Sequence, residues 1–213
     1  DRYVAAATNA WNFLQAAFTQ YGRDGAYQKL THYGNDYLHD DEVAWAAAAL
    51  YTATGDSRYE TALMSWMPDP TSRDIRRWTW WRLFGCWGNA IRTYVFADGR
   101  PGASARNATY LATCRNELIA GGTDQALRAE QSALGLSFPS ESKRIYSAGW
   151  YFPQAAAFDL AVAMQTTQDS TQRQRFESAL WSNLGFAWGA NPGNITFITG
   201  TGDESPIEPV PTG

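Results

Sequence analysis

Histidine, cysteine and long apolar runs are all scarce in this chain of 213 residues. The two histidines, His32 and His39, offer little material for a histidine-based zinc site or for a Ser-His-Asp triad. The two cysteines, Cys86 and Cys114, could pair or remain free, and they are weak evidence for an oxidising compartment. No apolar run approaches the roughly 18–20 residues of a membrane-spanning helix, so we expect no membrane partner.

The chain also has no large excess of charge of either sign. The formal net charge is −4 and the chain contains no basic block, which argues against nucleic acid as a partner. Hydrophobic residues make up 45% and charged residues 18%, a balance that excludes a disordered chain. The length suits one domain or part of a larger one.

Aromatic residues, in contrast, are abundant, with ten Trp, eleven Tyr and ten Phe. We expect most of them to fill a core. The others could line a groove for a flat ligand, such as a sugar ring or a base. The negative net charge favours the sugar.

The spacing of apolar residues predicts an all-α protein built from helical hairpins. Asp56 or Ser57 can cap the third helix, and Gly121 and Gly122 are expected to close the fifth. The alternation of Thr and Ile at 195–199 is the best strand signal in the chain. The expected helices span residues 2–21, 41–51, 58–66, 74–96, 103–119, 149–165 and 170–188.

Three segments together resemble glycoside hydrolase family nine, the cellulase family. Residues 41–47 read D-E-V-A-W-A-A and residues 50–56 read L-Y-T-A-T-G-D, similar to the family's D-E-L-A-W-A-A and L-Y-x-A-T-G-D. Residues 189–202 contain G-A-N-P and then T-F-I-T-G-T-G, at the spacing of the family's G-x-N-P-x-x-x-S-Y-V-T-G-x-G. A weaker third segment, A-A-A-F at 155–158, resembles A-A-N-A-A-F. If the chain were instead an unrelated helical scaffold, the spacing of the motif at residues 189–202 would match the family by coincidence.

The resemblance implies roughly half of an (α/α)6 barrel. Residues 1–213 would be the C-terminal portion of a single glycosidase catalytic domain, incomplete at both ends. The family's catalytic base in D-A-G-D and its late acidic Glu in N-E match nothing here, so no catalytic residue is assigned. Exposed apolar helix faces would then pack against the missing half of the barrel, which is the expected partner.

The activity implied is hydrolysis of a β-1,4-glucan by inversion, in a secreted enzyme whose catalytic Asp and Glu lie outside this chain. The isolated chain is therefore expected to be inactive. The alternative is a non-catalytic relative that binds glycans or builds an extracellular assembly. P-V-P-T at 209–212 matches the place of the family's sugar-holding P-H-H-R. Either the His and Arg are replaced there, or that loop is deleted and P-V-P belongs to later sequence. The loss of the His-His-Arg stretch favours the alternative.

Calcium is the implied ion, because several family members bind it at the matching acidic loop. Asp41 and Glu42 would supply side-chain ligands, and the carbonyls of Tyr37 and Leu38 would be candidates. The family's further acidic ligand is not evident, and Arg82 lies near its expected place. Two other interpretations stay open.

In the first, the acids at the start of the second helix only complement its dipole. In the second, Asp36, Asp40 or Asp41 is a catalytic carboxylate.

Four aromatic residues are candidates for sugar contacts. Tyr33 falls where the family often has a sugar-stacking Tyr, and Trp78 and Trp81 lie where it places a groove Trp. Tyr151 lies in S-A-G-W-Y-F at 147–152, roughly in place of the family's W-G-x-x-R-Y. The Arg of that pattern is lost, so subsite contacts are expected to differ from those of typical cellulases.

Overall fold

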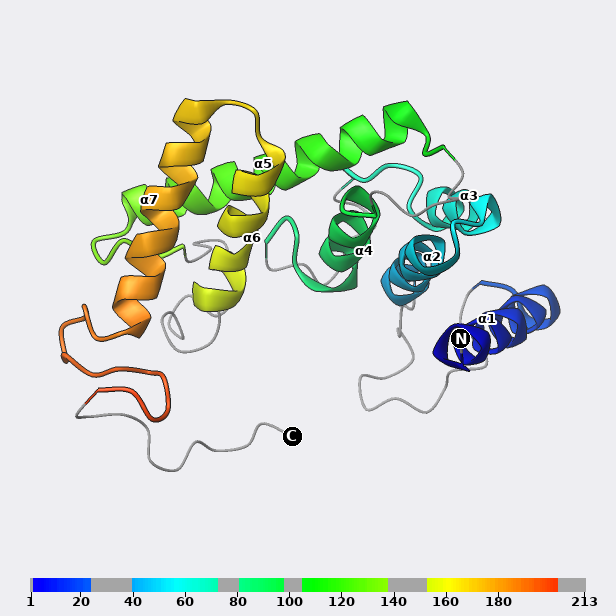
Figure 1. Cartoon of the computed structure of the whole chain (residues 1–213), viewed down its shortest axis with the longest axis horizontal. Helices are drawn as coiled ribbons and strands as arrows, with labels where there is room; N and C mark the ends of the chain where they lie inside the picture. Colours follow the sequence, from blue (N-terminus) through cyan, green and yellow to red (C-terminus); the bar gives the residue numbers. More distant parts are fainter. Residues whose placement is uncertain (1, 24–39, 73–80, 98–104, 138–152, 203–213) are drawn as a thin grey trace. The chain divides into compact units, whose positions relative to one another are not determined.

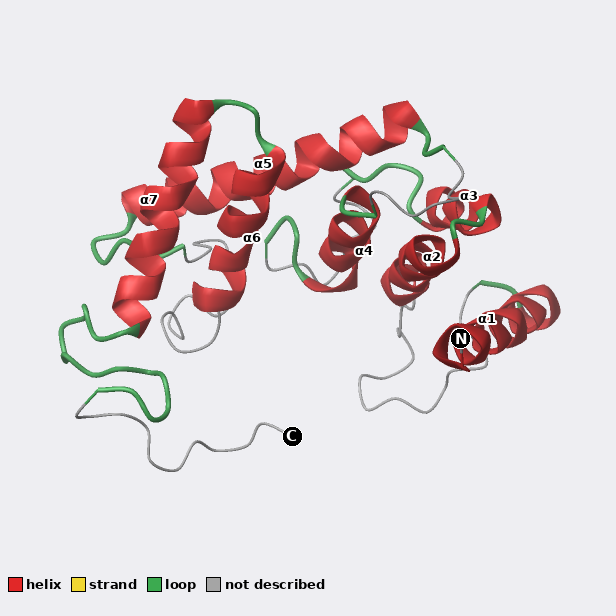
Figure 2. Ribbon diagram, in the orientation of Figure 1, coloured by secondary structure: helices red, strands yellow, loops and turns green. Residues whose placement is uncertain are grey.

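The structure is a computed structural model that describes residues 2–23, 40–72, 81–97, 105–137 and 153–202. These residues form helices joined by loops and contain no strand, which confirms the all-α prediction (Figures 1 and 2). None of the described helices is long and apolar enough to cross a membrane. The helices are α1 (Arg2–Tyr21), α2 (Asp40–Thr54), α3 (Ser57–Trp66), α4 (Gly85–Val95), α5 (Ala108–Gln131), α6 (Pro153–Thr166) and α7 (Ser170–Ala187).

Side-chain caps fix the starts of two helices where the sequence predicts them. Asp56 precedes α3 in an extended conformation, and its carboxylate accepts a hydrogen bond from the Arg58 backbone N–H at 2.9 Å. Asp169 precedes α7 and accepts from the N–H groups of Thr171 and Gln172. These carboxylates satisfy backbone donors that have no partner within the helix.

The chain divides into two compact units, and each is described by itself. The first comprises Asp1–Arg77 and Gly85–Arg115, and its core lies among α2, α3 and α4. Trp87, Ile91 and Tyr94 follow one another at spacings of four and three on α4, and all three are buried. That spacing is the stripe expected for one helix face.

The second unit comprises Trp78–Phe84 and Asn116–Gly213. Its core is built mainly of alanines on the later part of α5, on α6 and on α7, closed by two large side chains, Leu160 and Phe176. Small residues allow helices to approach closely, and the two large residues fill the space that remains. The loop that follows α7 belongs to this unit and contains the G-A-N-P segment.

The fourth helix is shorter than predicted. Residues 73–80 lie outside the described residues, and residues 81–84 form turns rather than helix. Helix α4 begins only at Gly85, whose φ of +70° is a left-handed conformation. A continuous helix cannot pass through such a residue, and apolar periodicity alone does not reveal it.

The fifth helix begins later and runs much further than predicted. Asn107 precedes it and accepts a hydrogen bond from the Tyr110 N–H, and α5 then continues through Gly121 and Gly122 to Gln131. The prediction that these glycines close the helix is therefore wrong. A Cβ at Gly122 would lie 2.3 Å from the Ala163 Cβ. The absence of a side chain at Gly122 therefore allows α5 to pack closely against α6.

The strand signal at 195–199 does not correspond to a strand, since these described residues form a loop with turns. The amide of Asn191 organises it: the Nδ2 donates to the carbonyls of Phe186 and Ile195, at 2.9 and 2.7 Å. Gly200 and Gly202 in the same loop have a positive φ, which glycine adopts readily. The backbone groups of this loop thus form local hydrogen bonds in place of the inter-strand hydrogen bonds that a strand would need.

Candidate functional site

The best-defined cluster of ionisable groups lies where α2 and α4 both begin. Asp40, Asp41 and Glu42 form the first turn of α2, and Cys86 is the second residue of α4. Because these two helices pack against each other, a carboxylate oxygen of Asp41, one of Glu42 and the Cys86 sulfur lie within 4.8 Å of one another. Asp41 and Cys86 are half-buried and Glu42 is exposed.

Partial burial and the neighbouring negative charge perturb the pKa of Glu42 in this cluster. Glu42 still contacts solvent, yet its pKa is raised to about 7. Partial desolvation is the main cause, followed by the hydrogen bond and the negative charge of Asp41. The pKa of the Cys86 thiol is raised to about 11 by burial and by the charges of both carboxylates. At neutral pH the thiol therefore stays protonated.

Chemically, the cluster suits a hard cation. A cation between two carboxylates offsets the repulsion between their negative charges. Hard cations also prefer oxygen ligands. A protonated thiol is a poor ligand for such an ion. The donors present therefore fit calcium through Asp41 and Glu42, and the structure brings these two predicted residues together.

The sequence did not single out Cys86 as part of this cluster. It lies far along the chain from Asp41, and only the packing of α2 on α4 brings the two together. The other two predicted calcium ligands, Tyr37 and Leu38, lie outside the described residues.

Three of the four candidate sugar contacts, Tyr33, Trp78 and Tyr151, also lie outside the described residues. Trp81 is described and is only 7% exposed. Its ring meets Phe84 edge to face at 4.8 Å, and Ala156 packs in the same cluster. Within its unit Trp81 is thus a core residue, and its contact with a sugar stays a prediction.

Arg82 is held by two carboxylates of its own unit. Its guanidinium donates to Asp124 at 2.8 Å and to Glu117 at 3.1 Å. Glu117 is almost fully buried, so its charge needs this partner. Because both acids lie on α5, the ion pairs fix the 81–84 turn against that helix.

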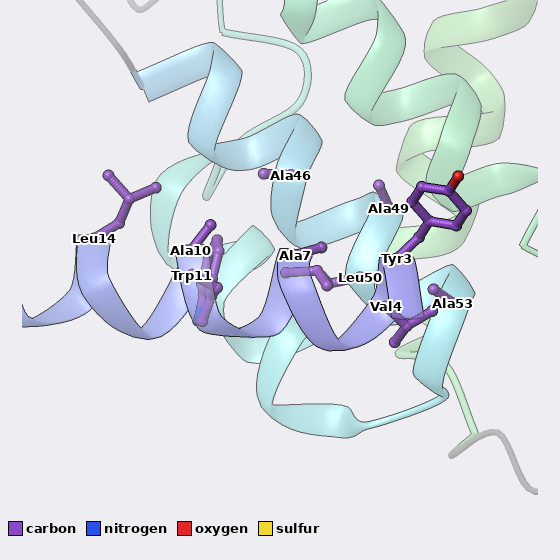
Figure 3. Close-up of a pocket in the computed structure, with 10 residues that line it drawn as sticks. All are labelled: Tyr3, Val4, Ala7, Ala10, Trp11, Leu14, Ala46, Ala49, Leu50 and Ala53. Atoms are coloured by element: carbon purple, nitrogen blue, oxygen red, sulfur yellow. The ribbon is translucent and has the colours of Figure 1, made fainter. Parts of the chain in front are cut away.

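An open apolar hollow of about 450 Å³ lies between α1 and α2 (Figure 3). Its lining includes Trp11 and Leu14 from α1 and Leu50 from α2, together with alanines from both helices. Sugar sites need several placed hydrogen-bonding groups, whereas the only polar side-chain atoms among these residues are the hydroxyl of Tyr3 and the indole nitrogen of Trp11. The hollow therefore has the character of a surface for helix packing and not of a sugar cleft.

Comparison with known proteins identifies the family. A family model described as Glycosyl hydrolase family 9 matches residues 1–212. The xyloglucan-specific endo-beta-1,4-glucanase of Bacteroides ovatus is 22% identical over 179 residues, which cover 83% of this chain and 28% of that protein. The chain thus spans well under half the length of this relative.

No solved structure matches the chain significantly. The family match nevertheless covers the acidic start of α2 and the G-A-N-P loop together, which excludes an unrelated helical scaffold. The all-α architecture agrees with a portion of an (α/α)6 barrel. The chain belongs to glycosyl hydrolase family 9.

Proposed function

We propose that this chain is the C-terminal portion of the catalytic domain of a secreted β-1,4-glucan hydrolase that acts by inversion. The observation that carries the proposal is the family match over residues 1–212. The similarity to a xyloglucan-specific endo-beta-1,4-glucanase supports a β-1,4-linked glucan as the substrate.

The two catalytic carboxyl groups lie outside these residues in this proposal. Inversion needs a general acid and a general base about 6.5–9.5 Å apart, facing a sugar and a water molecule. Two of the buried acids that the structure describes have other partners. Glu60 accepts hydrogen bonds from the Tyr94 hydroxyl and the Asn107 N–H, and Glu117 pairs with Arg82.

Calcium is proposed as a structural ion at the start of α2. Asp41 and Glu42 would hold it through their carboxylates, and the carbonyls of Tyr37 and Leu38 remain further candidates. Its charge would offset the partial desolvation of Glu42 and the repulsion from Asp41, which together raise the pKa of Glu42. The ion would thereby stabilise the junction of α2 and α4, where Cys86 lies.

Thermal unfolding tests the calcium proposal. Calcium at 100 times its Kd is expected to stabilise the EDTA-treated protein by about 2.7 kcal/mol, a rise of several degrees in Tm. Asp41→Asn should remove most of this rise. Glu130→Gln, which changes an exposed acid paired with Arg175, serves as the matched control. An equal calcium response in Asp41→Asn and wild type would refute the site.

The apolar hollow between α1 and α2 is proposed to be covered by the missing half of the barrel. Tyr3, at its rim, is 83% exposed, and Phe13 on the same helix is 72% exposed. Large apolar surfaces of this kind mark an interface. The isolated chain should consequently bind an apolar dye such as ANS more strongly than the full-length protein does.

Hydrolysis of β-1,4-glucans by the full-length protein tests the main proposal. Reducing ends should appear from cellulose or xyloglucan, and proton NMR of the first product should show the α-anomer. If the full-length sequence lacked both the D-A-G-D motif and the late Glu, the proposal that the protein is an enzyme would be contradicted.

The alternative is a glycan-binding or extracellular structural relative without catalysis. The observation that favours it is P-V-P-T at 209–212, where the family has P-H-H-R. Glucan binding by the full-length protein without any release of product would support this second function.

A further inference from the structure

We draw no further inference here: the strongest candidate, the Cys86 thiol that lies beside Asp41 and Glu42 where α2 and α4 begin, belongs to the calcium site already proposed, and nothing in the described part of the structure points to a second ligand there.

Discussion

Replacing Gly122 by alanine tests the packing of the second unit. A glycine in a helix interior normally costs about 1 kcal/mol relative to alanine, so Gly→Ala is usually stabilising. At Gly122 the new Cβ would lie 2.3 Å from the Ala163 Cβ, whereas carbon atoms pack best about 3.5–4.0 Å apart. Both atoms are attached directly to helix backbones, so relief requires the two helices to separate.

The size of the effect follows from these two opposing terms. Overpacking of a buried helix contact costs about 1–3 kcal/mol, and a contact this short belongs at the upper end of that range. Subtracting the gain in helix propensity leaves a net destabilisation of about 2 kcal/mol. Gly185 in α7 is the matched control, because a Cβ there meets only the Ala190 Cβ, at an ordinary 3.8 Å. Gly185→Ala should stabilise by about 0.5 kcal/mol.

Urea unfolding followed by circular dichroism measures both changes. We also expect rescue: in the Gly122→Ala background, Ala163→Gly should recover much of the lost stability, which a double-mutant cycle detects as a favourable coupling. A Gly122→Ala protein as stable as wild type would refute the close approach of α5 and α6. Destabilisation without any rescue would place the strain elsewhere than at Ala163.

Two polar networks give further predictions. Arg82→Met leaves the buried Glu117 carboxylate without this ion pair and should lower the free energy of unfolding by about 3–5 kcal/mol, whereas Arg175→Met, which breaks an exposed pair, should cost about 1 kcal/mol or less. Equal costs in urea unfolding would contradict this ranking. Tyr94→Phe removes a hydroxyl that donates to the buried Glu60 carboxylate and should cost about 1–3 kcal/mol in the same assay. A neutral result would show that water or another donor replaces the hydroxyl.

The helices with clear caps were predictable from the sequence. For α3, Asp56 is one of the two predicted cap residues, and α7 begins at the predicted residue 170, directly after Asp169. The family was also predictable, because its two motifs are local and their spacing is visible in the sequence. These features depend on neighbouring residues alone, so no tertiary information is needed.

The errors arose where distant residues determine the local structure. Gly121 and Gly122 look like a helix end, but their role is set by Leu83 and Ala163, which come from other segments. The apolar stripe through α4 continues upstream in the sequence, yet the left-handed Gly85 ends the helix there. A glycine permits each of these outcomes, and only the three-dimensional neighbours select one.

In the candidate site, too, residues that are neighbours in the sequence were predicted and distant ones were not. Asp41 and Glu42 were found because they are adjacent in a recognisable motif. Cys86 was not found, because only the packing of α2 against α4 brings it to within 4.8 Å of them. The burial of Trp81 likewise depends on Phe84 and Ala156, and Ala156 is far away in the chain.

The most direct test of the central claim compares two proteins side by side on a soluble β-1,4-glucan. One is the full-length protein and the other is the 213-residue chain, both at matched concentration and with calcium present. We predict that the full-length protein releases reducing ends and that the chain alone releases none, because the catalytic carboxyl groups are supplied by other residues. Sustained turnover by the 213-residue chain would contradict this prediction.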